Sequence, residues 1–172
     1  NAGLYLSVTQ GTEPNKDYTR YWHGTAMFIR LGHLITDVEG VKLIGFIAFL
    51  LLVGLTIFIL ARKRHWDLAV ILALSLATVQ IWNIRLSMEY QPGFILAFVL
   101  VPLFLILERR DDKWLTILSV VSGTAVAFFD FLTTETVTIL IPLALVIAVR
   151  TKENRLGSLK ENLLLLLKCG IC

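Results

Sequence analysis

The 172-residue chain is strongly apolar: 56% of its residues are hydrophobic, only 17% are charged, and its mean hydropathy is +0.75. Average soluble domains carry about 25% charged residues, so this composition favours a lipid environment over a large water-soluble core. The net charge of +3 would suit a nucleic-acid partner, but the basic residues lie between apolar runs instead of forming one face. We therefore expect a membrane protein that does not bind nucleic acid.

Residues 1–40 form the first predicted unit, an extracytoplasmic segment with an amphipathic helix. At 100° per residue, one arc of about 120° collects mostly aromatic and apolar side chains, namely Tyr18, Tyr21, Trp22, Thr25, Phe28 and Ile29. Arg20, His23 and Arg30 fall on the opposite side. Such a helix would lie along the membrane surface. It is either an interfacial anchor with snorkelling arginines or a substrate-facing helix whose basic residues bind a phosphate or sugar.

Two acids, Asp37 and Glu39, come just before the first long apolar run. Carboxylates at this place are candidate catalytic acids on the outer surface. A charged helix entry explains them equally well, because negative charge is favourable near a helix N-terminus. Both interpretations stay open.

Residues 41–172 form the second predicted unit, an all-α transmembrane bundle of about five spans. Five apolar runs carry this prediction, and a sixth begins near Leu163; the five are Val41 to Leu60, Leu68 to Trp82, Gly93 to Leu107, Trp114 to Phe129 and Thr136 to Val149. The first run has the full spanning length of about 20 residues. The others are nearer 15 residues, and their aromatic flanks extend them toward a span. Pro102 and Pro142 lie inside runs and should bend the helices there.

The connectors between the runs predict the orientation. Three connectors are basic, and they contain Arg62, Lys63 and Arg64, then Arg109, Arg110 and Lys113, then Arg150, Lys152, Arg155 and Lys160. The two connectors that alternate with them contain a single basic residue, Arg85. Basic loops stay in the cytoplasm, so residues 1–40 and the connectors with Glu89 and Asp130 are predicted to lie outside.

Asp130 and Glu89 are the remaining acids on the predicted outer side. Asp130 follows bulky apolar residues where the fourth run ends, and a carboxylate there faces a cavity, pairs with a partner or caps a helix. Glu89 precedes Pro92 and Gly93, and an exposed acid in a turn is its simpler explanation.

The cysteines, the histidines and the two chain ends carry little chemistry. Cys169 and Cys172 form one Cys-x-x-C without a thioredoxin-like context or two further zinc ligands, so we expect two small apolar residues of a membrane helix. The three histidines do not make a metal set, and no cofactor follows from the sequence. The start at Asn1, without methionine or signal-peptide pattern, suggests a fragment of a longer polytopic protein.

The segments Asp17-Tyr18-Thr19-Arg20-Tyr21-Trp22-His23-Gly24 and Phe129-Asp130-Phe131-Leu132-Thr133 carry a resemblance. Their layout resembles uncharacterised polytopic membrane proteins of Gram-positive bacteria and, more distantly, the GT-C superfamily of lipid-linked glycosyltransferases. The GT-C likeness rests on architecture. It implies that residues 1–40 are a long outer loop, that an acid acts as general base, and that the sugar donor is a polyprenyl phosphate.

The resemblance implies Asp17, Asp37 or Glu39 as the base and Arg20 or Arg30 as the phosphate ligand. With the outer-side residues added, the candidate catalytic acids are Asp17, Asp37 and Asp130, and the candidate substrate-binding residues are Arg20, His23, Arg30 and Glu89. The acidic motif of the GT-C superfamily normally follows directly after the first membrane helix, and here that region is cut off or reads Asn1-Ala2-Gly3. A transporter or flippase, and a non-catalytic scaffold in the membrane, remain alternatives.

Overall fold

The computed structural model describes residues 9–11, 24–88, 90–129 and 135–171, and this part of the chain is helical, without strands. The all-α prediction is confirmed for these residues. The elements are α2 (Gly24–His33), α3 (Val38–Arg62), α4 (Trp66–Thr78), the 3-10 helix η1 (Ile81–Leu86), α5 (Gln91–Leu107), α6 (Asp112–Phe129), α7 (Glu135–Lys152) and α8 (Leu159–Ile171). Asp17, Arg20, His23, Glu89 and Asp130 lie outside the described residues.

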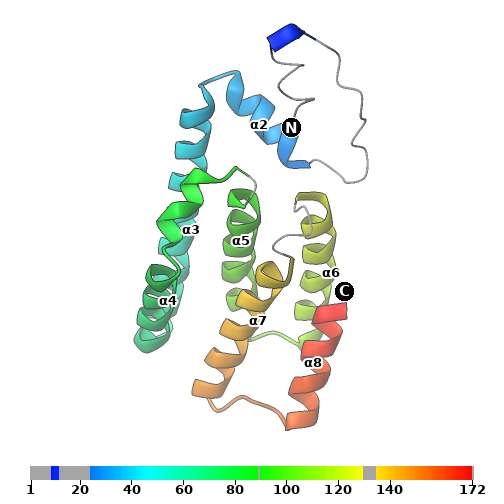
Figure 1. Cartoon of the computed structure of the whole chain (residues 1–172). Helices are drawn as coiled ribbons and strands as arrows, with labels where there is room; N and C mark the ends of the chain where they lie inside the picture. The colour runs from blue at the N-terminus through cyan, green and yellow to red at the C-terminus, as the bar shows by residue number, and fades with distance from the viewer. Residues whose placement is uncertain (1–8, 12–23, 89, 130–134, 172) are drawn as a thin grey trace.

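Helices α3 to α8 run alternately up and down, and α5 lies between α3 and α7 (Figure 1). Three apolar clusters hold this arrangement together. One joins α5, α6, α7 and α8 around Phe104, a second joins α3, α4 and α5 around Phe98, and a third joins α3, α4, α5 and α7 around Leu105. Because α5 contributes to all three clusters, it is the central helix of the bundle.

Within the described residues, two helices are long and apolar enough to cross a membrane: α3 with 25 residues and α6 with 18. Large apolar side chains such as Leu51 and Phe58 stay exposed on α3. The prediction of about five spans is not confirmed. Helices α4 and α5 have only 13 and 17 residues, so both are too short to count as full spans of about 20 residues. A 13-residue helix covers only about 20 Å of a membrane core that is about 30 Å thick.

The second apolar run is divided, contrary to the single helix expected from Leu68 to Trp82. Helix α4 ends at Thr78, and Gln80 adopts a left-handed backbone conformation with φ of 50°. A residue with this conformation ends an α-helix. The chain then continues as η1, which carries Trp82.

The prolines inside the apolar runs and Cys169 are buried between helices. Pro102 and Pro142 are both buried, in the neighbouring helices α5 and α7. Cys169 of α8 is buried with Leu165 and Leu115, as expected for an apolar residue. These residues therefore contribute to packing between neighbouring helices of the bundle.

Candidate functional site

An apolar cavity of about 320 Å³ lies beneath α2, between α2, α3, α5 and α6. Its walls are mainly aliphatic and aromatic, and the lining residues are Thr25, Phe28, Ile29, Gly45, Gln91, Pro92, Ile95, Leu96, Val99 and Phe129. Small-molecule sites in proteins typically have volumes of about 300–1,000 Å³ and apolar walls with a few polar groups. This cavity therefore has the size and chemistry of a site for an apolar chain.

Helix α2 is fixed to the top of α6 by its first two turns. Gly24 lies so close to Phe128 that a Cβ atom would overlap both the ring and the carbonyl oxygen. The Thr25 hydroxyl donates a 2.7 Å hydrogen bond to the Phe129 carbonyl, and the rings of Phe28 and Phe129 lie 5.6 Å apart. Thr25, Phe28 and Ile29, three residues of the predicted aromatic face, line the cavity, and Phe28 remains 54% exposed.

Gln91 supplies a polar group, besides the Thr25 hydroxyl, to this mainly apolar cavity. The side chain is only 6% exposed, and its Nε2 donates a 3.0 Å hydrogen bond to the Lys42 carbonyl of α3. Its Oε1 lies against Gly45, where any Cβ atom would overlap it. A glycine at this position lets α3 and the start of α5 approach each other, and the close approach positions the amide in the cavity wall.

Of the predicted site residues, the structure describes Arg30, Asp37 and Glu39. Arg30 is exposed on the flank of α2 that faces away from the cavity, in a more open groove that it shares with Met27 and Leu34. Asp37 is the N-cap of α3 and accepts a 2.8 Å hydrogen bond from the Gly40 backbone N–H. Glu39 pairs with Lys42 at 2.8 Å. These contacts favour the helix-entry interpretation of both acids.

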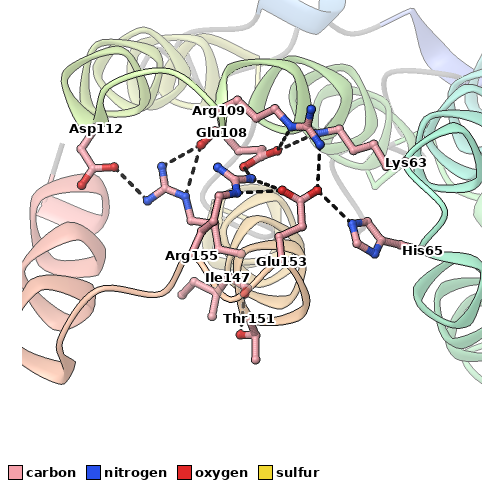
Figure 2. A network of polar contacts seen from close by, with 10 residues as sticks. Lys63, His65, Glu108, Arg109, Asp112, Ile147, Thr151, Glu153 and Arg155 are labelled. Carbon is pink, nitrogen blue, oxygen red and sulfur yellow. Dashed lines mark hydrogen bonds and ion pairs between the residues drawn. The ribbon is translucent and has the colours of Figure 1, made fainter.

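A second site, which is polar, lies at the opposite end of the bundle, where the three basic connectors meet (Figure 2). We call it the ionic cluster, and it consists of Lys63, His65, Glu108, Arg109, Asp112, Arg150, Glu153 and Arg155. Its centre is Glu108, whose side chain is fully buried. Lys63 binds this carboxylate at 2.5 Å, and Arg155 binds its other oxygen.

Glu153 is the second carboxylate that joins connectors. It lies just after α7 and contacts Arg109 at 3.0 Å, His65 at 3.2 Å and Arg155 at 2.7 Å. Burial by itself would raise the pKa of Glu153, but the hydrogen bonds from Arg109, His65 and Arg155 outweigh it and lower the pKa to about 2. The carboxylate is therefore ionised at every physiological pH.

Arg150 completes the connection between the last two connectors. Its guanidinium donates to the Glu108 carbonyl at 2.9 Å and to the Asp112 carboxylate at 2.8 Å. A separate pair joins Lys152 to Asp67 at the start of α4. The three basic connectors, separated in the sequence by whole helices, thus lie at one end of the molecule, as the alternating pattern predicted.

Sequence reasoning missed the ionic cluster because it counted only cations in the connectors. A usable signal was present, since Glu108 follows an apolar run directly and stands beside Arg109 and Arg110. It also missed Gln91, whose role depends on a contact with α3 that no local pattern reveals.

Replacing Asp37 in two ways separates a capping role from a catalytic one. Asparagine caps a helix about as well as aspartate, whereas alanine loses about 1 kcal/mol of stability. We expect Asp37→Ala to lower the thermal unfolding temperature and Asp37→Asn to leave it and any activity unchanged. Circular dichroism of the detergent-solubilised variants measures the first, and loss of activity in Asp37→Asn at normal stability would instead assign a general base.

Glu153 should make the fold sensitive to acid. Because its pKa is lowered from 4.5 to about 2, its contribution to stability is present above pH 4.5 and is lost as the pH falls toward 2. We expect Glu153→Gln to reduce the free energy of unfolding by roughly 2 kcal/mol at pH 7. The difference from wild type should disappear between pH 4.5 and 2 in thermal unfolding experiments.

The matched control for this experiment is Glu39→Gln. Like Glu153, Glu39 is paired with a cation, in this case Lys42, but the Glu39 side chain is 67% exposed. Exposed pairs contribute about 0–1 kcal/mol, so its loss should be small and nearly independent of pH. Equal losses in the two variants would contradict the role given to Glu153.

Comparison with models of known protein families, with curated proteins and with solved structures found no match to this chain. Function is therefore inferred from the residues and contacts described above. The cavity beneath α2 and the ionic cluster are the two features on which that inference depends.

Proposed function

We propose that the chain is a multi-pass membrane protein that acts on a lipid-linked substrate, as a GT-C-like glycosyltransferase with a polyprenyl-phosphate sugar donor. The observation that carries the proposal is the cavity beneath α2, which is apolar, about 320 Å³ in volume and bordered by an amphipathic helix. In this arrangement the ionic cluster lies on the cytoplasmic side, and residues 1–40 with α2 lie outside.

An apolar chain fits the cavity because the side chains of the cavity wall are mainly apolar and can make dispersion contacts with it. Phe28 and Ile29 border it from α2, and Ile95 and Val99 border it from α5. The Gln91 amide and the Thr25 hydroxyl are polar groups in the wall of the same cavity. A lipid entering here would place its chain against α5 and its polar end near α2.

Two of the candidate chemical groups are sequence neighbours of residues at the ends of α6 and α2. Asp130 is the residue directly after Phe129, and His23 directly precedes Gly24. We assign the base to Asp130 or Asp17, since Asp37 caps α3, and the donor phosphate to Arg20 and His23, since Arg30 faces away from the cavity. The base takes the proton of an acceptor hydroxyl, whose oxygen bonds to the sugar carbon as the lipid phosphate leaves.

Filling the cavity tests the lipid site directly. Ile95→Trp adds an indole to its wall, while Ile106→Trp makes the same change on the same helix at a side chain that is 61% exposed. We expect photolabelling by a polyprenyl-phosphate probe in nanodiscs to fall about tenfold in Ile95→Trp, which corresponds to about 1.4 kcal/mol. The Ile106→Trp control should be labelled like wild type, and equal labelling of both variants would remove the lipid site.

The catalytic part of the proposal has its own readout. Asp130→Asn and Asp17→Asn should be tested in intact cells at normal expression, with cell-envelope glycans as the product measured. Unchanged glycans in both variants, together with intact probe labelling, would leave a lipid-binding protein without transferase activity. Probe translocation in proteoliposomes that is lost in Ile95→Trp would then favour a flippase.

A further inference from the structure

Most of the acids at the connector end of the bundle already form ion pairs with neighbouring cations. Glu108 and Glu153 are bound by Lys63, Arg109, Arg155 and His65, as described above, and Asp112 and Asp67 are bound by Arg150 and Lys152. Within the described part of this end, five further exposed cations form no ion pair with an acid, namely Arg62, Arg64, Arg110, Lys113 and Lys160. The first four lie around the ends of α3 and α6, where the exposed Asp111 is the one described acid outside the ion pairs, so four cations and one acid leave this rim with net positive charge.

The cations of this rim stand next to exposed aromatic side chains. Trp66 begins α4 and is 64% exposed, and Trp114 lies in the first turn of α6 and is 47% exposed. Arg62 folds over the exposed ring of Phe58, with its guanidinium carbon 5.7 Å from the ring centroid. Tryptophan and snorkelling arginine together are typical of the level at which lipid headgroups lie.

We propose that this rim, which we call the cationic rim (Arg62, Arg64, Trp66, Arg110, Lys113 and Trp114), binds the headgroups of anionic phospholipids. The inference rests on the proposed membrane location of the bundle and adds a lipid preference to it. The four guanidinium and ammonium groups supply the charge complement of phosphate diesters. The two indoles fix the depth at which those phosphates meet the protein.

The position of the rim explains why the buried acids do not cancel this attraction. Glu108 is fully buried and Glu153 is 18% exposed, and each already accepts several hydrogen bonds from cations. The rim cations lie on α3, α6 and the two connectors next to them, at the ends of the two helices that are long enough to span a membrane. Anionic lipids are therefore expected around α3 and α6 at this end.

Tryptophan quenching by brominated lipids tests the proposal. One protein keeps Trp66 and Trp114, with Trp22→Phe and Trp82→Phe; a second keeps only Trp82, which lies on η1 after the other end of α4. Both are reconstituted with brominated phosphatidylglycerol or brominated phosphatidylcholine in otherwise identical vesicles. We expect about a fivefold preference for phosphatidylglycerol at Trp66 and Trp114, falling toward one in 1 M salt, and none at Trp82.

The control variants separate this surface from general lipid contact. The quadruple variant Arg62→Gln, Arg64→Gln, Arg110→Gln and Lys113→Gln should lose the preference, while Arg85→Gln on η1 should keep it. If the quadruple variant does not insert into vesicles, the loss of the phosphatidylglycerol preference of the unaltered cationic rim in 1 M salt tests the proposal instead. Equal quenching by both lipids, or an equal preference at Trp82, would overturn the cationic rim while leaving the membrane location intact. Quenching by neither lipid would overturn the membrane location as well.

Discussion

The buried carboxylate of Glu108 is the constraint on which the arrangement of the helices depends. A fully buried negative charge without partners is strongly unfavourable, so it must be met by cations with good geometry. Lys63 comes from the connector after α3, and Arg155 comes from the connector after α7. Glu108 itself ends α5, so one side chain joins three segments that the sequence separates by 45 and 47 residues.

Helices whose connectors meet at this end also surround the cavity at the other end. Apolar packing joins α3 to α5 and α5 to α6 above these connectors, and the opposite ends of the three helices surround the space beneath α2. Gly45, Gln91 and Phe129 meet there because the helices that carry them are already positioned by α5. The cavity is thus a property of the bundle, and α2 closes it through Thr25 and Phe28.

The helices themselves were predictable because each follows an apolar run. The run Val41 to Leu60 became α3, extended to Val38 by the Asp37 cap and to Arg62 at the other end. Helix α4 was overestimated, since nothing in the local pattern marks the left-handed Gln80. The ionic cluster and the Gln91 contact were not predictable in the same way, because each requires residues from helices that are distant in the sequence. Local patterns in the sequence therefore predict the helices, whereas the contacts between side chains of different helices depend on how those helices pack.

Cysteine accessibility measures most directly whether the connectors share one side of a membrane and α2 lies on the other. Single cysteines would replace Ile35, Arg64, Arg110 and Leu156 in a protein with Cys169→Ala and Cys172→Ala; all four positions are exposed. A membrane-impermeant maleimide should label position 35 in intact cells and positions 64, 110 and 156 only after the membrane is opened. Labelling of positions 35 and 64 from the same side would contradict this arrangement and the site proposed beneath α2.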